Sequence, residues 1–233
     1  MKMPIVDHQN IDFFATILVT MLSKKAQNVL RKILQRSQKQ QIEIGGYLDK
    51  FGRVQKTIKG EKHCVQVLPH HKYDIMFHTH YTHSFMDIVT NERNKNIPPS
   101  FGDIIIHLDS HCVKHAEYIC TETGYFFIDI NRYFEISEAE GYKIAVMYFT
   151  VIFAWYMFGK HNLSALELAD RYCQLAGRFD NEFVQSVIDD TDIVEYCLWI
   201  GGSIGLERVS PYIEKIKYFD GFKTMDITFH PWA

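Results

Sequence analysis

The sequence predicts an α/β fold, in which a mixed β-sheet is flanked by helices and followed by a C-terminal helical extension. Three observations predict this class: an amphipathic pattern over residues 11–39, short strand-like segments between 42 and 130, and helical patterns over most of the chain after 136. We expect an α/β domain over residues 11–135 and a mostly helical extension over 136–233.

Length, charge and cysteine content exclude several classes of protein. The 233 residues, 47% of them hydrophobic, suffice for one sizeable core, and the formal net charge of −3 gives no basic excess for nucleic acid. The five cysteines are odd in number and include no C-x-x-C pair, which argues against a disulfide framework and a thiolate zinc cluster. We therefore expect a soluble, intracellular and cytoplasmic protein with no nucleic-acid partner.

The first half of the chain predicts a helix and then strands. Residues 11–39 are predicted to be helical because apolar residues recur at spacings of three and four, with lysines and arginines between them. The pattern then changes to that of strands, which we place at residues 42–48, 53–58, 63–68 and 73–79. Residues 81–97 are polar and predict a long loop, of a kind that is often functional.

The second half begins with the Pro98-Pro99-Ser100 sequence, which predicts the start of a helix over 101–110. Two strands are predicted on either side of the turn at Thr123-Gly124, at 115–122 and 125–130. The remaining pattern predicts helices and a final strand-like piece, at 137–159, 164–176, 180–189, 210–218 and 222–229.

Residues 144–159 form an apolar run of sixteen residues between Lys143 and Lys160. A helix that crosses a membrane needs about 20 apolar residues. We therefore interpret the run as a helix that is buried against protein, either in the core of this chain or against a protein partner, and we expect no membrane association.

His78 and His80 end a predicted strand. Residues i and i+2 of a strand point to the same face, so the two imidazoles could bind one metal ion. Asp103 follows Ser100 in a Ser-x-x-Asp capping box, which places its carboxylate in the first turn of a helix. Two histidines and one carboxylate, with a fourth position open, are typical of a catalytic zinc site.

Glu43 lies inside an apolar strand-like segment, where an unpaired acid would be costly to bury. If this strand neighbours the histidine strand, the Glu43 carboxylate can reach a zinc-activated water and accept its proton. The alternative is that Glu43 lies on an edge strand and faces solvent, with no role in a site.

Taken in order, these residues resemble the JAMM (JAB/MPN) zinc metalloprotease domain family. The family signature is a Glu in a glycine-containing strand, then H-x-H at a strand end, then Ser-x-x-Asp at the start of a helix. This sequence has Glu43-Ile-Gly-Gly-Tyr-Leu, Phe77-His-Thr-His80 and Pro99-Ser-Phe-Gly-Asp-Ile104. The resemblance covers about residues 20–131.

The resemblance implies an MPN-like (cytidine-deaminase-like) fold and a zinc ion bound by His78, His80 and Asp103. It implies that Glu43 is the general acid/base and that Ser100 stabilises the oxyanion of the tetrahedral intermediate. It further implies a zinc-dependent amide hydrolase that cleaves peptide or isopeptide bonds in protein substrates, among them ubiquitin or ubiquitin-like conjugates.

Two features depart from the family pattern. Tyr81 stands where the family usually has proline, and nineteen residues separate His80 from Ser100 where the family usually has about seven. The insertion, residues 81–99, is predicted to form a mobile loop beside the site, where it could act as a lid, grip the substrate or obstruct the cleft.

Two alternatives stay open. A rival metal site on one helix could be formed by Asp103, His107 and His111, which are spaced four residues apart. His83 could instead join the zinc of the first site as an extra ligand. The chain could also be an MPN-fold scaffold, in a large complex or a viral particle, with little or no catalysis. The presence of all five motif residues favours the enzyme.

Overall fold

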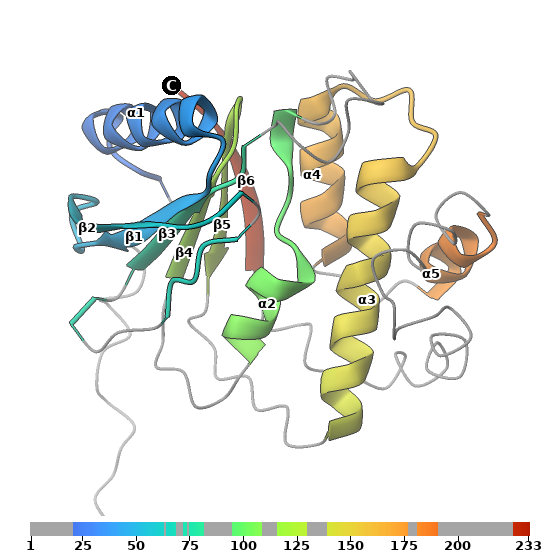
Figure 1. The fold of residues 1–233 in the computed structure, drawn as a ribbon. Coiled ribbons are helices and arrows are strands. Elements are labelled where there is room, and N and C mark those ends of the chain that lie inside the picture. Colours follow the sequence, from blue (N-terminus) through green and yellow to red (C-terminus); the bar gives the residue numbers. More distant parts are fainter. Residues whose placement is uncertain are drawn as a thin grey trace, which may run out of the picture.

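A computed structural model describes most of the chain, and its helices and strands form an α/β fold (Figure 1). The described residues are 21–62, 64–68, 72–73, 75–81, 95–108, 116–129, 139–176, 181–190 and 226–233, without the side chains of 105–108, 139–140, 142 and 181. Within these ranges lie a six-stranded mixed sheet and five helices, which confirms the predicted α/β class.

The sheet has the strand order β2-β1-β3-β4-β5-β6. Its strands are β1 (Ile44–Leu48), β2 (Val54–Lys59), β3 (Ile75–Thr79), β4 (Ala116–Cys120), β5 (Gly124–Asp129) and β6 (Asp226–Pro231). Neighbouring strands are antiparallel except for the central pair β3 and β4, which run parallel. A parallel pair needs a crossover, and helix α2 (Phe101–Leu108) lies in the connection between these two strands.

Helix α1 (Lys24–Gln40) covers one face of the sheet (Figure 1). It begins after Ser23, whose hydroxyl accepts a hydrogen bond from the amide of Ala26, and it ends where Gln41 adopts a left-handed conformation. Its buried side, which includes Leu30, packs with apolar residues of the strands, among them Phe77 and Tyr118. Of the predicted helix over 11–39, residues 11–20 lie outside the described part, and 21–23 are not helical.

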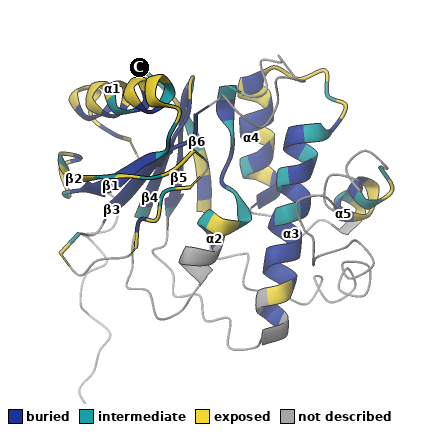
Figure 2. Ribbon diagram, in the orientation of Figure 1, coloured by how far each residue is buried: buried dark blue, intermediate teal, exposed yellow. Residues whose placement is uncertain are grey.

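The opposite face is covered by α2 and by two helices that follow β5, namely α3 (Ala139–Phe158) and α4 (Ala165–Ala176), while α5 (Asn181–Ile188) packs against α3 beyond them. Most described side chains of α3 are buried in the core of this chain (Figure 2). Among the described residues, no helix is long and apolar enough to cross a membrane. A protein partner that binds through 144–159 stays a prediction, and only a few residues such as Phe153 and Trp155 are partly exposed there.

The strand predicted at 63–68 is wrong for the described residues 64–68, which pair with no strand. This segment instead packs against the sheet, where Val67 is buried. A Cβ atom at Gly45 would lie 2.3 Å from Cγ2 of Val67, so the glycine is what allows the segment to approach β1. The alternating valines thus reflect contact with a face of the sheet rather than strand pairing.

The boundary predicted near residue 135 falls where residues 130–138 lie outside the described part, and it stays a prediction. Residues from both sides of it share one core, in which Ile119 and Phe126 of the sheet pack with Tyr148 of α3 and Leu168 of α4. Residues 226–229 of the predicted final strand belong to β6, which continues to 231, whereas residues 222–225 and the helix predicted at 210–218 are outside the described residues.

Candidate metal centre

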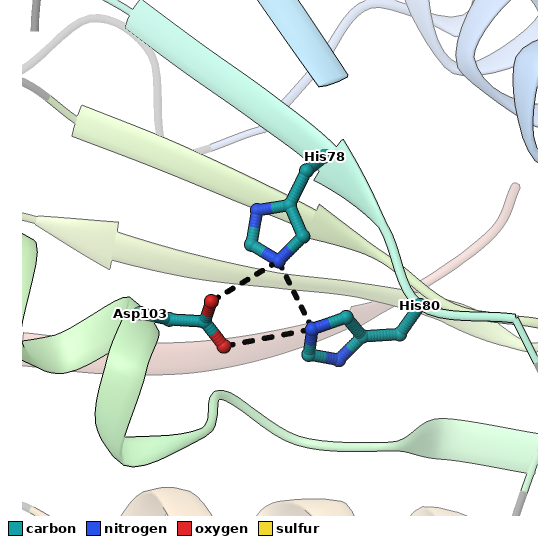
Figure 3. Close-up of side chains that lie close together, drawn as sticks. All are labelled: His78, His80 and Asp103. Atoms are coloured by element: carbon teal, nitrogen blue, oxygen red, sulfur yellow. Dashed lines mark hydrogen bonds and ion pairs between the residues drawn. The ribbon is translucent and has the colours of Figure 1, made fainter. Parts of the chain in front are cut away.

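His78, His80 and Asp103 form a buried group that could hold a metal ion (Figure 3). His78 lies near the end of β3, His80 follows the strand directly, and Asp103 lies in the first turn of α2. One ligand atom from each residue lies within 4.8 Å of the other two. Both histidines are buried, whereas the Asp103 side chain is 16% exposed, so the group meets solvent on the side of the aspartate.

Strand alternation and a capping box bring the three side chains together. His78 and His80 share one face of the sheet, while Thr79 between them points to the face covered by α1. The Ser100 backbone N–H and hydroxyl both donate to Oδ2 of Asp103, at 2.6 and 2.8 Å, and the Asp103 amide donates to the Ser100 hydroxyl at 3.3 Å. The predicted capping box is therefore present, and it orients the Asp103 carboxylate toward the histidines.

The distances between the three side chains match those expected around a tetrahedral ion. The Nε2 atoms of His78 and His80 lie 3.0 Å apart, and they lie 3.4 and 3.5 Å from the nearer Asp103 oxygens. Two ligand atoms bound to zinc at about 2.0–2.1 Å would be separated by roughly 3.3–3.4 Å in tetrahedral geometry. The group therefore has a size that suits a metal ion with tetrahedral ligands.

The other ring nitrogens of the two histidines are already hydrogen-bonded. Nδ1 of His80 lies 3.0 Å from the carbonyl oxygen of Ile97, and Nδ1 of His78 lies 2.7 Å from Oε1 of Glu117. A carbonyl oxygen only accepts, so Nδ1 of His80 carries its hydrogen, and Nδ1 of His78 donates to the carboxylate in the same way. In the neutral imidazoles, both Nε2 atoms are then lone-pair atoms, and they face each other beside a carboxylate. Such an arrangement requires a cation at its centre, either a proton or a metal ion.

The carboxylates around the two histidines also favour a positive charge on the imidazole rings. Burial by itself would lower the pKa of His78, but the carboxylates of Asp103 and Glu117 raise it to about 10. Burial likewise opposes protonation of His80, yet its hydrogen bond and charge interaction with Asp103 raise its pKa. Burial would raise the pKa of Asp103, and the two histidines lower it far below its usual value. Without metal, a proton takes the place of the cation.

Glu43 immediately precedes β1, and its position follows from hydrogen bonds on the β2 side and from the register with β3 on the other side. Its amide donates to Glu61 at 2.8 Å, and its carbonyl accepts from Gly60 at 2.9 Å, so its backbone extends the β1–β2 pair. The register pairs Gly45 with His78, which places Glu43 near His80 on the face of the ligands. The Glu43 carboxylate also contributes to the raised pKa values of both histidines.

On the face of the sheet that α1 covers, a chain of hydrogen bonds connects the two neighbours of Glu43 with the histidine strand. The Ile44 amide donates to the Thr79 hydroxyl at 3.0 Å, Thr79 donates to the Ser37 hydroxyl at 2.8 Å, and Ser37 donates to the Ile42 carbonyl at 2.6 Å. Thr79 and Ser37 are both fully buried. The residues on either side of Glu43 are thus tied to the residue between the two histidines.

Residues 95–100, which carry Ile97 and Ser100, are held by the helical extension. The buried Asn96 side chain donates to the carbonyl of Ala165 at 3.2 Å and accepts from the hydroxyl of Thr121 at 3.1 Å. The buried Tyr172 hydroxyl of α4 donates to the carbonyl of Pro99. Helix α4 therefore supports the segment that binds His80 and leads into the Asp103 helix.

Several predicted features lie outside the described residues. They include residues 82–94 of the insertion, His83, the side chain of His107 and His111, so neither the mobile loop nor the rival site is tested. Of the insertion, Tyr81 and Asn96 are buried. The Ser100 hydroxyl donates to Asp103, and it would have to exchange this bond to contact an oxyanion.

Sequence reasoning missed Glu117 and the carbonyl of Ile97. The backbone carbonyl leaves no trace in a sequence. Glu117 does leave one, because it is a charged residue inside an otherwise apolar strand-like segment, which is the same signal that singled out Glu43.

Comparison of the chain with models of protein families, with curated proteins and with solved structures finds no match.

Proposed function

We propose that the chain is a zinc-dependent amide hydrolase similar to the JAMM metalloproteases. One observation carries the proposal: two histidine Nε2 atoms and a carboxylate converge at 3.0–3.5 Å from one another, while both Nδ1 atoms are bonded elsewhere. Histidine and carboxylate ligands that leave one position open are typical of catalytic zinc.

The residues around the site would divide the reaction between them. His78, His80 and Asp103 would hold the zinc ion, which when bound acts as a Lewis acid toward water and a carbonyl group. Glu43 would take the proton of the attacking water and give it to the leaving nitrogen. Ser100, at the partly exposed side of the site, would donate its hydroxyl to the oxyanion of the substrate.

Metal content tests the first half of the proposal. We expect the purified protein to bind one zinc ion per chain, and the His78→Ala/His80→Ala double variant to bind none, as measured by elemental analysis after dialysis. Full zinc content in the double variant would exclude this site.

Replacement of Glu43 tests the second half. The Glu43→Gln variant should keep its zinc and its fold but lose about 10²–10⁴-fold in rate, because glutamine is nearly isosteric and cannot accept a proton. Glu61→Gln is the matched control, since Glu61 is exposed on the same hairpin. The assay uses generic peptides and ubiquitin-like isopeptide conjugates, with zinc measured in each sample.

The same assay separates the enzyme from the scaffold alternative. Equal cleavage by wild type and Glu43→Gln would exclude Glu43 as the acid/base. Zinc binding without cleavage of either substrate class would favour an MPN-like scaffold. Loss of zinc from Glu43→Gln would make Glu43 a ligand, and the site would have to be redrawn.

A further inference from the structure

Glu117 is a buried carboxylate that lies outside the sequence motif. It is 2% exposed on β4, one of the two central strands. The parallel register pairs Met76 with Glu117 and His78 with Ile119, so Glu117 lies on the same face as His78 but two residues further back. Its Oε1 atom extends forward along this face to Nδ1 of His78. A carboxylate in such a position is costly unless it serves a charged or strongly polarised partner.

The two histidines of the site are supported differently. Nδ1 of His80 is bound to a neutral carbonyl at 3.0 Å, whereas Nδ1 of His78 is bound to a carboxylate at 2.7 Å. Hydrogen bonds to an ionised acceptor are shorter and stronger than those to a neutral one. The carboxylate draws the Nδ1 hydrogen of His78 toward itself, which makes the opposite Nε2 atom a stronger donor to a metal ion.

Charge gives a second, independent reason for a glutamate at this position. A divalent cation between the two Nε2 atoms would carry two positive charges into a buried site. Asp103 supplies one negative charge at the ion, and Glu117 supplies another on the far side of the His78 ring. Glu117 and the nearby Glu43 carboxylate add to the negative charge of Asp103, and Glu117 does so in direct contact with the ring of His78, which lowers the cost of burying a divalent ion there.

We propose that Glu117 is a positioning residue of the metal centre, which holds His78 with its Nε2 atom directed at the metal and strengthens the binding of a divalent ion through its charge. This inference rests on the proposed metal site but not on the proposed hydrolysis. It concerns binding, so it can be tested without a substrate.

The test compares Glu117→Gln with wild type as full-length, metal-free proteins. Glutamine keeps an oxygen that can accept from Nδ1 of His78 and removes only the charge. We expect zinc affinity, measured by competition with a chromophoric chelator at fixed neutral pH, to fall by about 10–100-fold. The matched control is Glu122→Gln, since Glu122 is exposed in the turn that follows the same strand, and the zinc affinity of this variant should not change.

Cobalt substitution provides a readout that a purely structural role would not move. In Glu117→Gln we expect the ligand-field bands of bound Co(II) to shift while their intensity stays that of a four-coordinate site. Zinc affinity and cobalt bands equal to those of wild type would overturn the proposal. Zinc binding by neither protein would overturn the metal site and the inference together, whereas wild-type binding with an unaffected variant would overturn the inference alone.

A measurement on wild type keeps the proposal testable if Glu117→Gln does not fold. Long-range proton–nitrogen correlation spectra of the zinc-loaded protein should show His78 protonated at Nδ1. Protonation at Nε2 would place the metal on the wrong nitrogen and contradict the assigned role of Glu117.

Discussion

At the scale of single residues, the hydroxyl of Thr79 is central, although it points away from the metal site. It accepts from the Ile44 amide and donates to Ser37, in a region without exposure to solvent. Valine has the same shape but no hydroxyl, so Thr79→Val would leave buried polar groups without partners. We expect this variant to lose about 1–3 kcal/mol in the free energy of unfolding, measured by urea denaturation of the metal-free protein.

Thr57→Val is the control for this substitution, because Thr57 is exposed on β2. Its free energy of unfolding should stay within about 0.5 kcal/mol of wild type. Equal stability of the two variants would show that the hydrogen-bond chain does not hold β3 in place.

The raised pKa of His78 has a consequence for metal binding. With a pKa of about 10, His78 is protonated in the metal-free protein near neutral pH, and a metal ion must displace that proton. We therefore expect zinc binding at pH 7 to release about one proton or more, and zinc affinity to rise with pH. Calorimetry in buffers that differ in ionisation enthalpy measures the release, and binding without it would contradict the raised pKa.

The same pKa sets how stability depends on pH in the metal-free protein. The His78 pKa is higher in the folded state than the usual value of about 6.5, so its contribution to stability is fully present below that pH. The contribution is lost as the pH rises toward 10, because the folded protein then gives up the proton that holds the site together. Unfolding of the zinc-loaded protein should lack this loss.

How far the sequence predicts the site depends on how local each contact is. His78 and His80 are spaced by strand geometry, and Ser100 and Asp103 by a capping box, so their arrangement follows from short-range rules. Glu117 reaches His78 across the sheet, and the sequence alone does not state that β3 and β4 are neighbours. The register that brings them together is a property of the whole fold.

At the scale of elements, the segment at 64–68 shows why a strand pattern can mislead. Val65 and Val67 alternate as in a strand, but Val67 is buried on the face of β1 next to Gly45. Alternation indicates only that every second side chain is buried, and a segment that lies across a sheet satisfies this without pairing. The amphipathic helix α1 was easier to predict because its long repeat has no such second interpretation.

We expect Gly45→Ala to force this segment away from β1. The added Cβ would lie 2.3 Å from Cγ2 of Val67 and 3.1 Å from the carbonyl oxygen of Phe77. The cost should be about 1–3 kcal/mol in the free energy of unfolding. Since Val67→Ala removes the nearer atom, the double variant should be more stable than the sum of the two single changes predicts.

Gly102→Ala serves as the control, because among the described residues a Cβ there would meet only the Ser100 hydroxyl oxygen, at 3.5 Å. Alanine is preferred over glycine within a helix by roughly 0.5–1 kcal/mol, so this variant should be neutral or slightly stabilised. Denaturation curves of wild type and the four variants measure these costs, and additive costs for Gly45→Ala and Val67→Ala would refute the contact.

At the scale of the whole molecule, helix α4 supports the candidate metal centre, although it follows the sheet by many residues in the chain. Tyr172 and the Ala165 carbonyl hold the segment that supports His80, and the core joins residues of both predicted domains. We therefore expect one cooperative unfolding transition, with the same midpoint by far-ultraviolet and near-ultraviolet circular dichroism. Two separate transitions would show that the extension folds as an independent unit.

Strand β6 has a consequence for the order in which the chain can fold. It pairs along its whole length with β5, and the sequence between Asp129 and Asp226 must be brought round before the two strands meet. Closing so long a loop costs entropy before the pairing returns any free energy, and such non-local contacts slow folding. The residues of the candidate metal site lie much closer together in the chain, between β3 and α2. Zinc could thus find its ligands while the last strand is still unpaired, and the slow step of refolding would belong to the edge of the sheet rather than to the metal.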